Sequence, residues 1–324
     1  MNLPRLGVEH QLKSLAAYGG RLARVNTLED VISGALAGLD ELFGWSHCLL
    51  LVHQPELGRL VTIGSHGYDV GGSGSEVALG EGVIGMAGAR RQTMRIGNLQ
   101  RMLQYARSVR HDDTQRMAAE IRLPGLVDAR SQLAAPMLSR GVLLGVLAAE
   151  SSGSLVFDEL DEYVLTVAAH LVAGAFEREQ LETSDFELDG RSDEQPTYNA
   201  PVRRDLPAPI PSEIGASTLV LRHYATDGST FLDDDYIIKG VAGRLLWKVV
   251  SEHAATGRTA FTNREAKLDP VLELPEYRDN FESRLILLKK RLEERDAPVR
   301  IYAAGRGRFG LEITVPLHLD HITN

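Results

Sequence analysis

The sequence has little of the material from which disulfide frameworks, zinc sites or membrane anchors are made. Its 324 residues include one cysteine, Cys48, so neither an intrachain disulfide nor a cysteine-rich zinc site is possible. No stretch approaches the roughly 18 uninterrupted apolar residues that span a bilayer. The first residues lack the basic start and the continuous apolar core of a secretory signal. These absences predict a cytoplasmic protein that does not enter a membrane.

Acidic side chains exceed basic ones, and the excess is unevenly spread. The formal net charge is −9, yet residues 281–310 carry 8 basic against 4 acidic side chains. An acidic protein with one basic stretch permits a phosphate-binding face near its C-terminus without requiring one.

Prolines divide the chain. Residues 183–216 hold five of them, together with many acids and almost no apolar periodicity. Such a composition buries too little surface to order itself, which predicts an extended linker. We therefore expect an N-terminal helical extension over residues 1–24, a domain over 25–182, the acidic, proline-rich linker over 183–216 and a second domain over 217–324.

Helix and strand patterns alternate in the first domain. Residues 28–43 place apolar side chains at helical spacing, with Thr27 as N-cap. The runs HCLLLVH and RLVTIGSHGY, and later LAAPML and GVLLGVLAAES, read as two strand pairs. The amphipathic pattern FDELDEYVLTVAAHLVAGAFERE closes the domain as a helix with acids in its first turn. Helices at both ends of an antiparallel sheet predict an α+β fold.

Residues 79–100 (LGEGVIGMAGARRQTMRIGNLQ) and 131–177 (SQLAAPMLSRGVLLGV to the closing helix) resemble a GAF domain. The resemblance extends over most of residues 25–180 and implies an antiparallel sheet flanked by helices. GAF domains bind small ligands or chromophores, or serve as dimerising modules, and are usually not enzymes. The sulfoxide reductases of this family need several cysteines, so the single cysteine excludes their activity, and we predict Cys48 to be a small buried strand residue.

No enzyme, cofactor or metal is predicted for this domain. No catalytic constellation stands out, and the Asn-Lys-Phe-Asp-Glu motif of cyclic-nucleotide phosphodiesterase GAF domains is absent, which weakens cyclic nucleotide as a ligand. His47 and His53 would lie about 20 Å apart along one strand, too far to share an ion. The sequence RHDDTQ (110–115) reads as a solvated loop leading into a helix.

A small ligand is nevertheless predicted. The arginine-rich stretch 99–126 lies where GAF domains cover their pocket, and its polar side chains could fix an anionic or aromatic ligand. The candidate ligand-binding residues are Tyr105, Arg110, His111 and Arg122. In the alternative, these are surface side chains of a lid whose cavity is filled with leucine and methionine.

The C-terminal sequence GRGRFG (305–310) spells the G-x-G-x-x-G pattern of a dinucleotide-binding turn. Such a turn must end a strand and open a helix. Here Leu311, Ile313, Val315 and Leu317 alternate with period two, so a strand follows. The motif is predicted to be a hairpin tip that needs glycines and displays two arginines.

The rest of the second domain predicts three helices. The first ends at Gly257, the second opens with the capping box Thr262–Glu265, and the third repeats apolar residues from Tyr277 to Leu292. With the terminal hairpin, residues 217–315 resemble a winged helix of the OmpR type. That family carries a DNA-binding role onto a defined set of positions here, which are Thr262, Arg264, Arg284, Lys289, Arg306 and Arg308.

Two readings of the second domain remain open. Ile286 and Leu287 are expected on the exposed face of the third helix, where apolar side chains would favour a protein interface over DNA. The loop LDPVLELPEY (268–277) precedes that helix, and the family can contact RNA polymerase there. The protein is thus either a DNA-binding transcriptional regulator or a signalling adaptor whose winged helix docks on a protein partner.

A homodimer is also predicted, through the closing helix of the first domain together with the helix over residues 27–43. The closing helix of the first domain carries an apolar stripe wider than one sheet face needs, made of Leu160, Val164, Val167, Leu171, Val172 and Ala175. Paired copies of such helices bury stripes of this kind.

Overall fold

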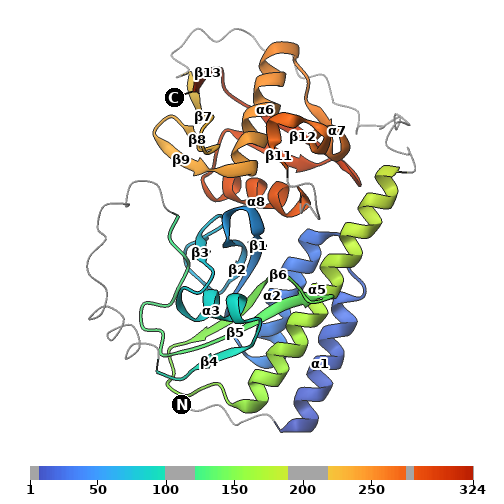
Figure 1. Ribbon diagram of the computed structural model, residues 1–324, viewed down its shortest axis with the longest axis vertical. Helices are drawn as coiled ribbons and strands as arrows, with labels where there is room; N and C mark the ends of the chain where they lie inside the picture. Colours follow the sequence, from blue (N-terminus) through green and yellow to red (C-terminus); the bar gives the residue numbers. More distant parts are fainter. Residues whose placement is uncertain (1–6, 99–120, 189–217, 275–280, 324) are drawn as a thin grey trace, which may run out of the picture. The chain divides into compact units, whose positions relative to one another are not determined.

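The computed structural model describes residues 7–98, 121–188, 218–274 and 281–323 of the chain, and for residues 183–188 the backbone alone. The chain divides into two compact units, Met1–Gln180 and Leu181–Asn324 (Figure 1).

The first unit is built on a six-stranded antiparallel sheet with the strand order β3-β2-β1-β6-β5-β4. Its strands are β1 (His47–Gln54), β2 (Arg59–His66), β3 (Glu76–Ala78), β4 (Met94–Ile96), β5 (Ser131–Ser139) and β6 (Val142–Ser151), with a short 3-10 turn, η1 (Pro55–Leu57), between β1 and β2. The two strand pairs expected from the sequence, β1–β2 and β5–β6, are confirmed.

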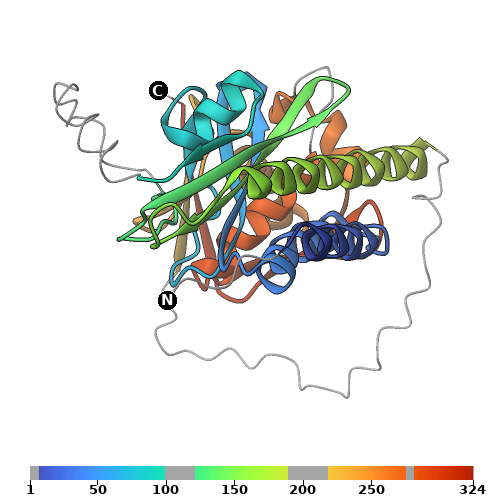
Figure 2. The same ribbon diagram turned by 90° about the horizontal axis from the view of Figure 1, so that it is seen from below.

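Helices cover both faces of this sheet. Five consecutive residues of β1, Cys48 to Val52, are buried, as expected of a strand covered on both sides. The helices α1 (Val8–Leu22), α2 (Leu28–Phe43) and α5 (Glu159–Leu188) lie on one side and α3 (Gly82–Arg90) lies on the other (Figure 2). Cys48 is a buried strand residue, as predicted.

Local chemistry sets the ends of α2. The hydroxyl of Thr27 accepts a hydrogen bond from the backbone N–H of Asp30, and Gly44 closes the helix in the left-handed conformation with φ 73°. A glycine adopts that conformation without the steric cost that a Cβ imposes. The predicted helix and its N-cap are confirmed.

The helix α1 packs along α5. Gln11 donates to the Asp161 carboxylate at 3.2 Å, and Arg178 donates to the carbonyl of Leu22 at 3.2 Å. Gly19 faces Leu171 of α5, and a Cβ at this position would lie in ordinary van der Waals contact with it at 3.5 Å. The helix α5 continues to Leu188, so the start of the segment expected as linker is helical.

Over its described residues from 218 onward, the second unit contains two small sheets and three α-helices. Its elements are β7 (Leu219–Tyr224), β8 (Thr230–Leu232), β9 (Asp235–Ile238), α6 (Gly240–Thr256), β10 (Ala260–Thr262), α7 (Asn263–Leu268), η2 (Pro270–Leu272), α8 (Phe281–Glu294), β11 (Val299–Ala303), β12 (Arg308–Ile313) and β13 (Leu317–Ile322). The sheets have the orders β13-β7-β8-β9 and β10-β12-β11. The left-handed C-cap at Gly257 and the capping box Thr262–Glu265 are both present, as predicted.

The G-x-G-x-x-G stretch is a hairpin tip. The strands β11 and β12 pair antiparallel on either side of it, from Val299↔Ile313 to Ala303↔Phe309. Gly305 and Gly307 have φ angles of 114° and 68°, a region that side chains other than glycine rarely adopt. A strand follows the glycines, so the predicted hairpin tip is confirmed.

The end of the chain differs from expectation. The period-two run from Leu311 to Leu317 was expected to be one strand, yet β12 ends at Ile313 and β13 begins at Leu317. Pro316 lies at the break, and a proline has no N–H to give to a sheet ladder. The new strand leaves the hairpin and pairs in parallel with β7, from Leu317↔Leu219 to Ile322↔Tyr224.

The buried side of α8 also differs from expectation. The sequence assigned Leu285, Leu288 and Leu292 to the core and Leu287 to the exposed face. Leu287 is buried at 2% exposure, Leu285 is only half-buried, and the buried positions follow an i, i+3, i+4, i+7, i+8 stripe, which is Arg284, Leu287, Leu288, Arg291 and Leu292. Two arginines lie within that stripe, and one of them, Arg284, was predicted to contact DNA. Ile286 is half-buried, and the expected start of the helix near Tyr277 lies outside the described residues.

Candidate functional site

A buried carboxylate lies at one end of the central strands of the first unit. Glu150, near the end of β6, is 7% exposed. One of its oxygens accepts hydrogen bonds from the Tyr68 hydroxyl at 3.2 Å and the Leu126 backbone N–H at 3.1 Å, and the other accepts from the Gln132 amide at 2.8 Å. Three segments distant in sequence therefore converge on one side chain.

Burial and hydrogen bonding act on the pKa of Glu150 in opposite directions. Burial raises the pKa of the Glu150 carboxyl, and the hydrogen bonds from Leu126, Tyr68 and Gln132 offset only part of that rise. Burial likewise raises the pKa of the Tyr68 hydroxyl. The imidazole of His47, a cross-strand neighbour of Glu150, packs edge-on against Tyr68 with ring centroids 5.4 Å apart. The group is a compact polar cluster in which three donors converge on the Glu150 carboxyl.

Apolar packing fills much of the sheet face under α3. Val83, Ile84 and Ala87 of α3 meet Leu49, Leu51, Leu60, Ala134, Val146 and Ala148 from the sheet. Tyr68 and Leu126, two contacts of the polar cluster, pack against the same apolar group. Glu150 was not predicted from the sequence as a site residue. A signal was present, because Glu150 ends the otherwise apolar strand sequence GVLLGVLAAE. Charged side chains in buried strands rarely lack a specific partner.

The predicted ligand-binding residues are only partly visible. Tyr105, Arg110 and His111 lie outside the described residues. Arg122 is exposed to solvent, and its role as a ligand contact stays a prediction. Within the described ranges, no group of three or more His, Cys, Asp or Glu side chains is close enough to hold a metal ion.

A second candidate site lies at the edge of the β10-β12-β11 sheet in the C-terminal unit. The pairing of β10 with β12 sets Thr262 opposite Arg308, and the backbone N–H of Asn263 donates to the Gly307 carbonyl at 2.8 Å. The start of α7 and the tip of the β11–β12 hairpin are thereby joined. Arg264 and Arg306 are exposed, and Arg308 is half-buried.

The two predicted DNA contacts on α8 differ in accessibility. Lys289 is half-buried, whereas Arg284 is buried at 4% exposure. The expectation that Arg284 presents its guanidinium to a partner is at odds with this burial. Its neighbour in the stripe, Arg291, shows how such a side chain is accommodated, because it donates to the carbonyls of Ile237 at 2.9 Å and Tyr236 at 3.3 Å.

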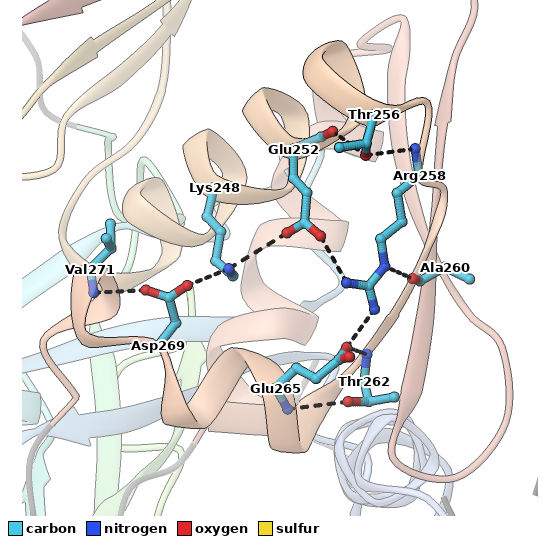
Figure 3. Close-up of polar contacts among 9 residues, drawn as sticks. All are labelled: Lys248, Glu252, Thr256, Arg258, Ala260, Thr262, Glu265, Asp269 and Val271. Atoms are coloured by element: carbon cyan, nitrogen blue, oxygen red, sulfur yellow. Dashed lines mark hydrogen bonds and ion pairs between the residues drawn. The ribbon is translucent and has the colours of Figure 1, made fainter. Parts of the chain in front are cut away.

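A chain of ion pairs secures α7 (Figure 3). Arg258 contacts Glu252 at 2.7 Å and Glu265 at 2.6 Å, and its guanidinium also lies 4.9 Å from the centre of the Phe261 ring. Lys248 links Glu252 to Asp269, whose carboxylate also accepts the Val271 N–H.

The capping box and the ion-pair chain share one carboxylate. Glu265 accepts the Thr262 N–H at 3.2 Å while Thr262 accepts the Glu265 N–H at 3.1 Å. Partial burial alone would raise the pKa of Glu265, but the ion pair with Arg258 and the hydrogen bonds with Thr262 together bring that pKa below its usual value. The carboxylate therefore stays charged, and it fixes the first turn of α7 beside the hairpin tip.

In the part of the chain that the structure describes, no helix is long and apolar enough to cross a membrane.

Solved structures similar to this chain are GAF domains and a GAF-fold enzyme. The GAF domain of a phosphoenolpyruvate-protein phosphotransferase from Coxiella burnetii is 18% identical, with a TM-score of 0.45 over 55% of this chain and 99% of that one. Its counterpart from Acinetobacter is 18% identical, with a TM-score of 0.45 over 54% and 97%. A free methionine-R-sulfoxide reductase from Neisseria meningitidis is 21% identical, with a TM-score of 0.43 over 56% and 99%. No curated protein matches the chain.

The family assignment rests on a comparison with family models. Residues 25–177 match the model of the GAF domain. The matched range begins just before α2 and ends within α5, so it spans the antiparallel sheet, α3 and the Glu150 cluster. The N-terminal region of this protein is therefore a GAF domain.

Proposed function

We propose that the protein is a cytoplasmic signalling regulator in which the GAF domain senses a small ligand and the C-terminal unit is a winged helix that binds DNA. The observation that carries the DNA-binding part is the joining of the α7 start to the β11–β12 hairpin tip. Thr262 and Arg308 are strand partners there, Arg264 is exposed at the start of α7, and Arg306 is exposed at the hairpin tip, where it also pairs with Glu182 at 2.6 Å. Arginines at a hairpin tip and a helix start can contact adjacent phosphates of one duplex.

The order of elements supports the winged-helix assignment. Three helices follow the first strands, a short strand precedes the second helix, and a hairpin follows the third. In such a domain the third helix enters the major groove while the hairpin contacts the neighbouring groove. Arg284 and Lys289 are the two α8 residues predicted to contact DNA. Because Arg284 is buried and Lys289 is only half-buried, Lys289 is the one proposed to reach a groove.

The test is a DNA titration of the full-length protein at several salt concentrations, against sequences selected by genomic footprinting. The double variant Arg306→Ala/Arg308→Ala should bind more weakly and lower the salt slope by about two, since each lost phosphate contact lowers it by roughly one. Arg300→Ala is the matched control, because Arg300 is exposed on the same hairpin but away from its tip. Absence of any salt-dependent binding by the wild-type protein would reject the DNA-binding proposal.

A protein-docking role for the second unit is the alternative. Leu268 and Val271, at the end of α7 and in η2, are large apolar residues exposed to solvent. Exposed apolar side chains that adjoin on a surface favour a protein partner, such as RNA polymerase or another signalling protein. Leu268→Ser/Val271→Ser should then abolish partner binding and leave DNA binding unchanged.

Ligand sensing by the GAF domain is proposed on the Glu150 cluster. Glu150, Tyr68 and Gln132 supply convergent polar groups at the border of an apolar sheet face, the combination from which small-molecule sites are built. The segment that contributes the Leu126 N–H directly follows residues 99–120, where Tyr105, Arg110 and His111 were predicted to hold a ligand.

A homodimer through α1 and α5 completes the proposal. Part of the stripe predicted on α5 is used within the domain, since Val164, Val172 and Ala175 are buried and Leu160 is half-buried. The remaining members, Val167 and Leu171, are exposed. They are joined by further exposed apolar residues on the same two helices, which are Val8, Leu12 and Tyr163. Identical patches of this kind on two copies can bury one another about a twofold axis.

A further inference from the structure

The outer face of the β13-β7-β8-β9 sheet carries a row of aromatic side chains. In β7, Leu221 and His223 are buried on the side that packs against α6, where His223 stacks on Trp247 at 5.3 Å. Successive residues of a strand point to opposite faces, so Arg222 and Tyr224 lie on the other side. The four strands run side by side in Figure 1.

Register aligns the row across the strands. Arg222 is the partner of Phe231, and Phe231 is the partner of Tyr236. Phe231 packs edge-on against Tyr224 at 5.7 Å and against Tyr236 at 5.3 Å. The three rings, hereafter the aromatic row, are each half-buried, so part of every ring remains accessible to solvent.

Sheet stability accounts for only part of this arrangement. Cross-strand aromatic pairs stabilise a sheet, but the outer face of an antiparallel sheet is ordinarily polar. Threonine would fill such positions with good strand propensity and no exposed ring. Three accessible rings in register form a surface that can take a partner.

The charges around the aromatic row determine which partner fits. Arg222 is paired with Asp320 of β13 at 3.3 Å and is thereby neutralised. Three consecutive aspartates, Asp233, Asp234 and Asp235, are exposed at the β8–β9 turn, next to Tyr236. Phosphates would be repelled from this surface. Ammonium or guanidinium groups would be attracted by the carboxylates and can stack on the ring faces.

We propose that the aromatic row and the Asp233–Asp235 turn form a docking surface for an extended segment rich in arginine or lysine on a partner protein. Cations would lie over Phe231 and Tyr236, and the aspartates would hold the next cation along the segment. This surface is separate from the α7–hairpin edge proposed for DNA, so the two roles can be tested independently.

The test measures binding of the full-length protein to a fluorescent peptide of alternating arginine and glycine, by anisotropy. Phe231→Leu keeps apolar bulk and removes the π face, and Tyr236→Thr keeps strand propensity. Each should raise Kd by about tenfold, as expected for loss of a well-formed cation–π contact. Asp234→Asn/Asp235→Asn should also raise Kd and should weaken its dependence on salt.

Tyr302→Thr is the matched control, because Tyr302 is an aromatic of the other sheet with 45% exposure, and this variant should bind the peptide like the wild type. Circular dichroism of each variant verifies that the sheet is intact. The proposal is overturned if the wild type does not bind the peptide, or if Phe231→Leu and Tyr302→Thr bind it equally. It is also overturned if single-stranded DNA of the same length binds in place of the peptide. DNA affinity at the α7–hairpin edge should be unchanged in all these variants.

Discussion

His223 lies in the core of the C-terminal unit at 2% exposure, in a group of three mutually stacked rings with Trp247 and His321. Its Nδ1 is 3.0 Å from the Thr230 hydroxyl oxygen, whose single proton also has the carbonyls of Gly228 and Gly243 within hydrogen-bond distance. Burial, the neighbouring His321 and Arg244 lower the pKa of His223 to about 4, while Asp227 opposes this shift.

Acid should therefore destabilise the C-terminal unit through His223. A histidine whose pKa is lower in the folded chain than in the unfolded one contributes stability above the unfolded value, and this stability is lost as the pH falls from about 6.5 towards 4. Between about pH 7 and about pH 5, the loss should be on the order of 2 kcal/mol. Urea unfolding followed by Trp247 fluorescence, in a Trp45→Phe background, measures it. His223→Gln should flatten this dependence, whereas His318→Gln, on the exposed side of β13, should not.

The Glu150 cluster leads to a second prediction for a single residue. Glu150→Ala leaves the Tyr68 hydroxyl, the Leu126 N–H and the Gln132 amide without their acceptor, which should destabilise the GAF domain by about 3 kcal/mol. Glu150→Gln retains one carbonyl oxygen and should cost less, since Gln132 can present its own oxygen to the new amide. Thermal unfolding of both variants, with the exposed Glu81→Ala as control, checks the order. Equal losses for Gln and Ala would mean that the hydrogen bonds contribute little.

At the scale of single residues, the burial of an apolar residue could be predicted from the sequence, but the burial of charged residues could not. Cys48 was predicted as a buried strand residue because it lies in a strand pattern next to Leu49 and Leu50. The burial of Arg284 and Arg291 was not predictable, since it depends on long apolar stems and, for Arg291, on carbonyls supplied by β9, some fifty residues earlier. The same holds for Glu150, whose three donors come from distant segments.

Helix ends are the elements that local chemistry specifies most firmly. The capping box of α7 was predicted from the spacing of Thr262 and Glu265 alone. Removing it by Thr262→Ala should destabilise the C-terminal unit by about 1 kcal/mol. Thr226→Ala, in the exposed β7–β8 turn, should have almost no effect in the same urea titration. A larger loss for Thr226→Ala than for Thr262→Ala would contradict the assigned role of the cap.

Long-range pairing limited prediction at the scale of elements. The strand β13 joins β7 in parallel across about a hundred residues, and no local period records such a partner. Pro316, which lies between β12 and β13, can be read from the sequence, but the pairing of β13 with β7 cannot. The α6 and α2 helices, by contrast, follow from periodicity and caps within their own sequences.

At the scale of the whole molecule, three surfaces differ in chemistry, and each fits a different kind of partner. The arginine-bearing edge of the second unit fits an anionic partner, the aromatic row with its aspartates fits a cationic one, and the α1–α5 face is apolar. An apolar face of this kind fits a second copy of the chain, because both copies present the same residues. Signal passage from a GAF domain to DNA would also gain from a dimer, since two DNA-contacting units bind one duplex with a higher effective concentration.

The dimer prediction is tested by light scattering of the full-length protein at micromolar concentration. The wild type should have twice the mass of the chain. Leu12→Glu/Val167→Glu introduces like charges at the centre of the proposed interface, where burial of a carboxylate is costly, and should yield monomers. Both side chains are exposed in the single chain, so the domain itself should stay folded. Val70→Glu places the same charge on an exposed residue between β2 and β3, away from α1 and α5, and should leave the dimer intact. A monomeric wild type, or dissociation by Val70→Glu as readily as by the helix variant, would rule out assembly through α1 and α5.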